Sequence, residues 1–197
     1  MSDDGPNGLD KLNEERAVEV QVIVETPQGS RNKYVMDPKT GKIRLDRMLF
    51  TSTRYPLDYG SVIGTLAEDG EPLDALVLLE EPTFPGCEVI ARPVAVFWML
   101  DQGKPDAKIL TVPAGDPRLA GVRDLSDVSP YLLAEIAHFF NIYKELEPGQ
   151  STDVRGWQGR AEAERCVETA RRRLLPLCNR SIAISGQRAG IYGTRRP

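Results

Sequence analysis

Short apolar segments separated by glycine and proline fill residues 18–113 and limit the folds that this chain can adopt. In the first segment, 18–25, valine occupies every second position from Val18 to Val24, which is the period of a strand with one buried face. Further extended segments are expected at 33–37, 42–46, 76–79, 88–100 and 108–112. A succession of five or more short strands predicts a small barrel or a strongly curved sheet.

The sequence becomes helical in character after Asp127. Ser129-Pro130 offers an N-cap followed by proline at the first helical position, and apolar residues then recur every three or four positions to about Glu147. Residues 160–175 show the same spacing, with arginine and glutamate on the other face. Strands followed by helices predict an α+β fold.

The length of the chain favours one folded domain. With 197 residues, of which 41% are hydrophobic, it can bury a single substantial core. We expect a flexible arm at 1–16, a globular domain at 17–175 and a flexible basic tail at 176–197, which has four arginines and no acidic residue.

The charge balance and the cysteines bear on partners and location. The 25 basic and 29 acidic residues give a net charge of −4, which offers no broad attraction for nucleic acid or an anionic membrane. No signal segment opens the chain, and no apolar run approaches the ~20 residues that span a bilayer. Three cysteines without C-x-x-C spacing suit a reducing compartment. We expect a soluble, cytoplasmic protein with no nucleic-acid or membrane partner.

Three carboxylates fall within the six residues Asp69-Gly70-Glu71-Pro72-Leu73-Asp74. Glycine and proline favour a turn that brings these carboxylates together, where they repel one another unless a cation neutralises them. Mg²⁺ is commonly held by one or two carboxylates together with waters and substrate phosphates. Taken alone, the run fits an exposed acidic turn better than a metal site.

Two further features favour a metal and phosphate site. Asp101 ends an extended segment, and Asp106 and Lys108 lie on one face of the next. A set of cations and phenols suits phosphate oxygens: Lys33, Arg47, Tyr55, Tyr59, Lys108, Tyr143 and Lys144. Carboxylates for metal ions and cations for phosphates are what metal-assisted phosphoryl transfer needs.

These residues resemble the soluble family I inorganic pyrophosphatases, and the actinobacterial members most. The resemblance runs from about Val20 to Leu174 and depends on an ordered set of strings: Val24-Glu25-Thr26-Pro27, Arg31-Asn32-Lys33-Tyr34, Leu45-Asp46-Arg47, Tyr55-Pro56-Leu57-Asp58-Tyr59-Gly60, the acidic run at 69–74, Asp101 to Lys108, and Ala137-His138-Phe139-Phe140 before Tyr143-Lys144. The resemblance implies a five-stranded OB-like barrel flanked by two main C-terminal helices, Mg²⁺ as cofactor with Mn²⁺ as a substitute, pyrophosphate as substrate, and a homo-oligomer, plausibly a hexamer.

The resemblance also implies a role for each site residue. Asp69, Asp74 and Asp106 would hold one metal ion, with Asp74 bridging to a second, and Asp101 with Asp106 would hold a further ion. Glu25 would organise metal-bound waters. Glu71 and Asp106 would be the catalytic residues, with Glu71 receiving the proton of the nucleophilic water, and the cations and phenols named above would bind the phosphates.

The sequence departs from the family pattern at three positions. Glu71 and Val35 stand where the family has Asp and an acid, and Gln102 replaces an acid beside Asp101. The leading hypothesis is hydrolysis of pyrophosphate to two phosphates by metal-activated water. The alternatives are a weakly active or inactive relative that binds pyrophosphate or a nucleotide, and an OB-type nucleic-acid module, which the net negative charge disfavours.

Overall fold

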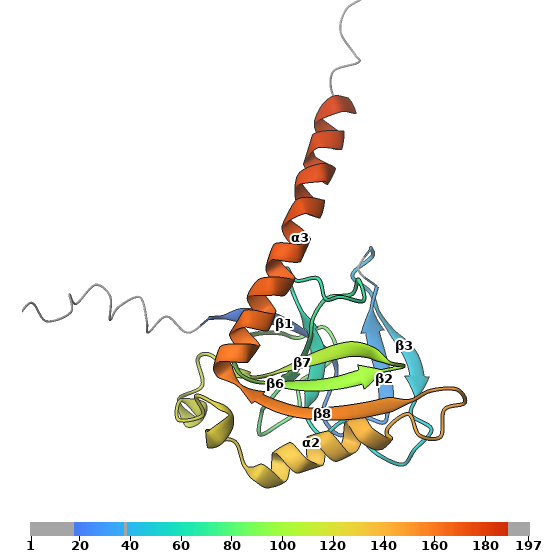
Figure 1. The fold of residues 1–197 in the computed structure, drawn as a ribbon, viewed down its shortest axis with the longest axis vertical. Helices are drawn as coiled ribbons and strands as arrows, with labels where there is room; N and C mark the ends of the chain where they lie inside the picture. The colour runs from blue at the N-terminus through green and yellow to red at the C-terminus, as the bar shows by residue number, and fades with distance from the viewer. Residues whose placement is uncertain (1–17, 38, 189–197) are drawn as a thin grey trace, which may run out of the picture.

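The computed structural model describes residues 18–37 and 39–188 (Figure 1). Its strands are β1 (Val20–Thr26), β2 (Asn32–Met36), β3 (Ile43–Met48), β4 (Asp58–Val62), β5 (Asp74–Val77), β6 (Glu88–Asp101), β7 (Lys104–Pro113) and β8 (Thr152–Gly159), and its α-helices are α2 (Pro130–Ile142) and α3 (Arg160–Arg188). Short 3-10 helices lie at Pro117–Leu119 and Leu125–Asp127. The predicted arm at 1–16 lies outside the described residues. Within those residues, no helix combines the length and apolarity needed to cross a membrane.

Five strands close into a barrel in the order β1-β4-β5-β7-β6, because the start of β6 pairs back with β1. β5 and β7 are parallel, and the other neighbours in the ring are antiparallel. β8 adds to the later part of β6, and β2 and β3 form a separate hairpin. The α+β class and the five-stranded OB-like barrel are therefore confirmed.

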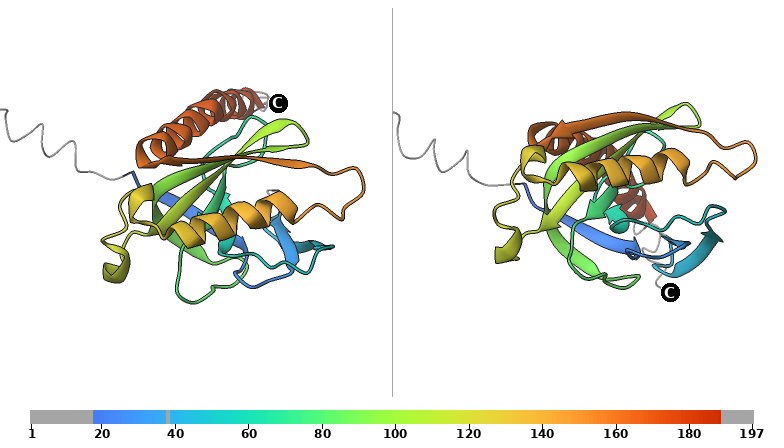
Figure 2. Two further views of the ribbon diagram at one scale, coloured as in Figure 1. Left: turned by 60° about the horizontal axis from the view of Figure 1, so that its bottom comes forward. Right: turned by 90° about the horizontal axis from the view of Figure 1, so that it is seen from below.

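The two helices cover different sides of the strands (Figure 2). Ile136, Phe139 and Phe140 of α2 pack in one buried cluster, which also contains Leu76 and Leu110 from the barrel. Ala163, Val167 and Ala170 of α3 pack in a second cluster, which contains the neighbouring strand residues Ala75, Val77 and Ile109. Successive residues of a strand thus pack into different clusters, because their side chains point to opposite faces of the sheet.

Several elements differ from the sequence prediction. β4 and β8 were not expected, because Asp58–Val62 contains a glycine and Thr152–Gly159 has few apolar residues, so that pairing with neighbouring strands defines both. Helix α2 ends at Ile142 rather than near Glu147, and turns follow it. Helix α3 continues past Leu175 to Arg188, so part of the expected tail is helical. The flexibility of that tail stays a prediction, and 189–197 lie outside the described residues.

Gly60 allows β4 to approach β1 closely. It pairs with Val24, and a Cβ atom at position 60 would lie 1.9 Å from the main-chain oxygen of Ile23. That distance is far inside van der Waals contact, and the clashing atom belongs to the backbone of a buried strand. A glycine is therefore required here for the barrel to close.

We expect Gly60→Ala to lower the free energy of unfolding by about 1–3 kcal/mol or more, because the added methyl group must push β1 and β4 apart. Urea denaturation followed by circular dichroism measures this loss. Gly115→Ala is the matched control, since a Cβ there meets no atom within 4 Å. Equal stability of the two variants would contradict the close approach.

Candidate active site

The parallel pairing of β5 with β7 places Asp74 beside Lys108. The Lys108 ammonium lies 2.7 Å from Asp74 Oδ2 and 3.1 Å from each carboxylate oxygen of Asp106. The Tyr59 hydroxyl donates a further hydrogen bond to Asp74 Oδ2. Asp106 and Lys108 lie on one face of β7, as their two-residue spacing predicts, and Lys108 joins two carboxylates from different strands.

Lys108 is almost completely buried, with 1% of its surface exposed. Its ammonium also lies 5.3 Å from the ring centre of Tyr59 and 4.9 Å from that of Phe140, within the range of cation–π attraction. Burial alone would lower the pKa of Lys108, but Asp74 and Asp106 outweigh it and hold the pKa well above its ordinary value. Burial raises the pKa of Asp106, with Lys108 acting against this shift. The ammonium is thus fixed in its charged form.

Asp101 forms a second acidic position at the end of β6. Gln102 and Gly103 both have positive φ, 51° and 78°, which makes a tight two-residue turn into β7. The Lys144 ammonium contacts Asp101 Oδ2 at 2.6 Å. Asp101 Oδ1 is buried without a hydrogen-bond partner among the described residues.

A cavity of about 210 Å³ lies beside this carboxylate and is lined by Asp69, Asp101 and Asp106, together with Gln102, Lys104 and Pro105. A buried carboxylate oxygen without a partner is costly, and a cation would satisfy it. The donor set therefore fits a hard divalent cation. Within 18–37 and 39–188, however, no three acidic, histidine or cysteine side chains already converge on one point.

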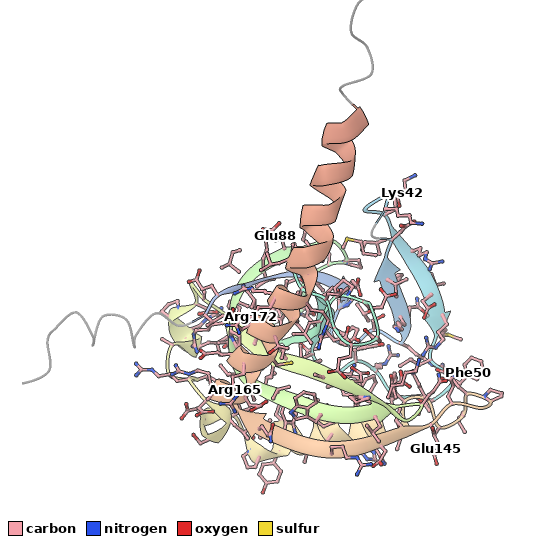
Figure 3. All side chains as sticks on the ribbon, turned by 45° about the horizontal axis from the view of Figure 1, so that its top comes forward. Lys42, Phe50, Glu88, Glu145, Arg165 and Arg172 are labelled. Carbon is pink, nitrogen blue, oxygen red and sulfur yellow. The ribbon has the colours of Figure 1, made fainter. Side chains whose placement is uncertain are left out.

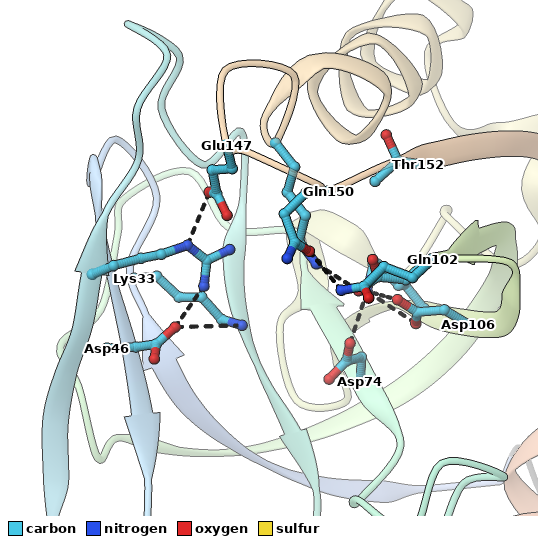
Figure 4. A network of polar contacts seen from close by, with 12 residues as sticks. Lys33, Asp46, Asp74, Gln102, Asp106, Glu147, Gln150 and Thr152 are labelled. Carbon is cyan, nitrogen blue, oxygen red and sulfur yellow. Dashed lines mark hydrogen bonds and ion pairs between the residues drawn. The ribbon is translucent and has the colours of Figure 1, made fainter.

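The basic part of the site lies on the β2-β3 hairpin, where Lys33 pairs with Arg47. Arg47 donates from Nε to Glu147 at 2.9 Å and from Nη1 to Asp46 at 2.6 Å, and Lys33 lies 4.0 Å from Asp46. Figure 4 shows this group across from Asp74 and Asp106. Burial lowers the pKa of Lys33, which Asp74 partly offsets. The hairpin therefore presents two cations toward the acidic group.

The three predicted phenols belong to the buried aromatic cluster beside Lys108. The Tyr55 ring lies 5.4 Å from that of Tyr59, and the Tyr143 ring lies 5.4 Å from that of Phe140. Burial is the largest cause that raises the pKa of Tyr55, Tyr59 and Tyr143 above the ordinary value. All three hydroxyls therefore keep their protons at neutral pH and can act as neutral donors.

Glu25 and Glu71 differ sharply in their surroundings. Glu25 is buried, and its Oε1 accepts hydrogen bonds from Ser61 Oγ at 3.1 Å and the Met36 N–H at 3.2 Å. Burial raises the pKa of Glu25. Glu71 is exposed, and its main-chain N–H donates to Asp69 Oδ1 at 3.0 Å. Its carboxylate makes no hydrogen bond or ion pair with any described residue, so the structure leaves Glu71 outside the connected cluster.

Two acidic partners of the site were missed in the sequence. Asp46 lies inside the quoted string Leu45-Asp46-Arg47, so its position beside Arg47 was visible although its contact was not. Glu147 lies 100 residues from Arg47, and no local pattern links the two. The hairpin cations are therefore already paired with carboxylates.

Comparison with known proteins decides the family. The family model described as inorganic pyrophosphatase matches residues 22–175. A Streptomyces coelicolor protein named inorganic pyrophosphatase is 54% identical over 156 residues, which cover 79% of this chain and 96% of that protein. The chain belongs to the inorganic pyrophosphatase family. The resemblance to actinobacterial members is thus confirmed, and a Corynebacterium glutamicum protein of the same name is 53% identical over 146 residues, 74% of this chain and 92% of that one.

A solved pyrophosphatase structure supports the same assignment. The inorganic pyrophosphatase of Thermus thermophilus superposes with a TM-score of 0.78 at 43% identity, covering 81% of this chain and 92% of that one. Inorganic pyrophosphatases of this family generally depend on a metal ion. The acidic group around Lys108 therefore lies in a fold shared with proteins named inorganic pyrophosphatase.

Replacement of Lys108 tests the energetic role of the buried ammonium. We expect Lys108→Met to lower the free energy of unfolding by about 3–5 kcal/mol in buffer with EDTA, because Asp74 and Asp106 lose their buried partner. Lys104→Met, at an exposed position of the same strand, should change stability by less than about 0.5 kcal/mol. Urea denaturation measures both, and a small loss in Lys108→Met would contradict the proposed pairing energy.

Proposed function

We propose that this chain hydrolyses inorganic pyrophosphate to two phosphates with Mg²⁺ as cofactor, and that Mn²⁺ can substitute. The observation that carries the proposal is the group of Asp74, Lys108 and Asp106, next to Asp101 with its unpartnered buried oxygen. Acidic groups for a hard cation lie opposite cations for phosphate oxygens (Figure 4). Family membership makes pyrophosphate the substrate that fits this combination.

We assign the metal-holding role to the carboxylates Asp69, Asp74, Asp101 and Asp106, with Glu25 orienting coordinated waters. The assignment of Asp69 is supported by its position in the wall of the same cavity as Asp101 and Asp106. Bound Mg²⁺ would lower the pKa of a coordinated water and neutralise charge on the phosphates. The buried position of Glu25, with both its donors on Oε1, leaves Oε2 for a water.

The substrate-binding role goes to the cations and phenols Lys33, Arg47, Tyr55, Tyr59, Lys108, Tyr143 and Lys144. Glu147 and Asp46 hold Nε and Nη1 of Arg47, so the planar guanidinium is oriented before substrate arrives. Its Nη2 makes no hydrogen bond to another described residue. A cation held in place in this way stabilises the charge on a leaving phosphate without having to move during the reaction.

Glu71 and Asp106 are the proposed catalytic residues, with Glu71 as the acceptor of the proton from the attacking water. The exposed Glu71 carboxylate makes no hydrogen bond or ion pair with another described residue, so it can accept a proton without breaking an ion pair. Its side chain is one methylene longer than the aspartate of the family pattern. A displacement of about 1 Å can cost about 100-fold in rate, so the residue is a sensitive position for this enzyme.

The domain bounds, the oligomeric state and the location of the protein are also part of the proposal. We place the catalytic domain at 17–175, with 1–16 and 176–197 as additional segments. A homo-oligomer, plausibly a hexamer, is supported by large exposed apolar side chains, among them Leu45, Met48 and Phe50. A cytoplasmic location is supported by the free thiols of Cys87 and Cys166.

Phosphate release from pyrophosphate tests the proposal directly. We expect Mg²⁺-dependent release that EDTA abolishes, a measurable rate with Mn²⁺, and a loss of about 100-fold or more in Asp74→Asn, because the amide cannot neutralise a cation. Glu80→Gln changes an exposed acid that follows β5 in the chain and pairs with Arg118, and it should keep the wild-type rate. Absence of turnover in pure, folded protein would refute the proposed activity.

The role of Glu71 can be tested in the same assay. Glu71→Gln keeps the shape of the side chain but removes its basicity, so kcat should fall by about 100-fold. Glu71→Asp retains the base and should turn over at or above the wild-type rate. A wild-type rate in Glu71→Gln would assign the proton acceptor elsewhere.

A further inference from the structure

Helix α3 is bonded to the connection between β4 and β5, which carries Asp69. The Leu66 N–H donates to the main-chain oxygen of Ala170 at 3.0 Å. Arg173 Nη1 donates to the main-chain oxygen of Leu66, also at 3.0 Å, and its Nη2 lies 3.4 Å from the Glu68 carboxylate. Both main-chain groups of Leu66 are therefore held by α3.

The segment that follows Leu66 is a compact turn. The Ala67 N–H donates to the Glu71 oxygen at 2.8 Å, and the Gly70 N–H donates to the Ala67 oxygen at 3.3 Å. The Glu71 N–H bonds to Asp69 Oδ1 within the same turn. Residues 67–71 are thus linked to one another and move as a unit, so the position of Asp69 depends on what anchors the two ends of this turn.

Packing supplies only part of that anchor: Ala67 packs against the cluster that contains Ala163, Val167 and Ala170 of α3, but a cavity of about 280 Å³ is lined by both the turn and the helix. Its walls include Ala67, Asp69 and Pro72 on one side and Cys166 and Arg173 on the other. Atoms that face a void gain no dispersion contacts across it. At the far end, the Leu73 N–H bonds to Thr65 Oγ1 at 3.0 Å. At the near end, the bonds from α3 to Leu66 supply the polar part of the anchor.

We propose that Arg173 is a positioning residue, which fixes the turn at 67–71 and so sets how Asp69 meets Asp74 and Asp106 at the metal site. The effect on cation affinity rests on the proposed metal site, whereas the anchoring of the turn does not. The planar guanidinium of Arg173 donates from two nitrogens to a carbonyl and a carboxylate at once, and a lysine ammonium at this position does not reproduce that geometry. Arg173 itself makes no hydrogen bond or ion pair with Asp69, Asp74 or Asp106 in the described structure.

The neighbouring arginines provide matched controls. Arg171 donates to the Glu19 oxygen at the start of the barrel, and Arg172 pairs with Glu168 one helical turn earlier. Arg172 is exposed on α3 (Figure 3), and neither side chain bonds to residues 66–71. Arg172→Ala therefore removes the same charge from the same part of the helix without releasing the turn.

Binding of Mn²⁺ without substrate, followed by the paramagnetic resonance of the free ion, tests the proposal. We expect Arg173→Ala to weaken the affinity by about 3- to 10-fold, the effect expected when a charge-assisted hydrogen bond no longer orders a ligand loop. In Arg173→Lys, the logarithm of the Mn²⁺ affinity should fall by about half as much as in Arg173→Ala, and the affinity of Arg172→Ala should match that of the wild type.

Two further measurements test the same proposal. Exchange of the Leu66 amide hydrogen with solvent should be faster in Arg173→Ala. The Mg²⁺ concentration for half-maximal activity should rise, with kcat at saturating Mg²⁺ nearly unchanged.

Wild-type Mn²⁺ affinity and Leu66 exchange in folded Arg173→Ala would overturn the proposal. If that variant does not fold, Arg173→Lys and Glu68→Gln carry the test, and wild-type affinity in both would overturn it equally. A wild-type protein that binds Mn²⁺ but releases no phosphate would refute the proposed function and leave the role of Arg173 intact. A wild-type protein that binds no ion would refute the metal site. The rate of Leu66 amide exchange in Arg173→Ala would then show whether Arg173 anchors the turn.

Discussion

The buried ammonium of Lys108 is the interaction on which the rest of the site depends. Two charged carboxylates that approach each other away from water repel unless a cation or a proton compensates their charge, and Lys108 supplies the cation for Asp74 and Asp106. The parallel register of β5 and β7 sets this contact, and Phe140 of α2 lies beside the ammonium. Strand pairing and helix packing therefore determine the position of the same three side chains.

The barrel also explains how residues far apart in the sequence meet. The acidic residues come from β5, β6 and β7, which are neighbours in the sheet, whereas the cations Lys33 and Arg47 come from a hairpin that lies outside the barrel order. Glu147, after α2, reaches Arg47 and links the helical side of the molecule to that hairpin. The acidic residues Asp74, Asp101 and Asp106 thus belong to strands, whereas Asp69 lies in an exposed turn that needs its own anchor.

The sequence predicts those features that depend on local spacing. Alternating valines identified β1, and the two-residue spacing of Asp106 and Lys108 placed both on one face. The strand β8 was missed because its pairing with β6, rather than its own apolar residues, defines it. The contacts Arg47 to Glu147 and Arg173 to Leu66 each span about a hundred residues, so no periodicity encodes them. The roles of the individual site residues came from the family resemblance and stay predictions.

Crystals grown with Mn²⁺ and imidodiphosphate, a pyrophosphate analogue with a P–N–P link that resists hydrolysis, would test the central claim most directly. Anomalous scattering at the manganese edge locates the ions without reference to any assumed site. The predicted result is manganese bound by carboxylates of Asp69, Asp74, Asp101 and Asp106, with the analogue between these ions and the cations Lys33 and Arg47. Manganese bound elsewhere, with Asp74 and Asp106 still paired only to Lys108, would contradict the account.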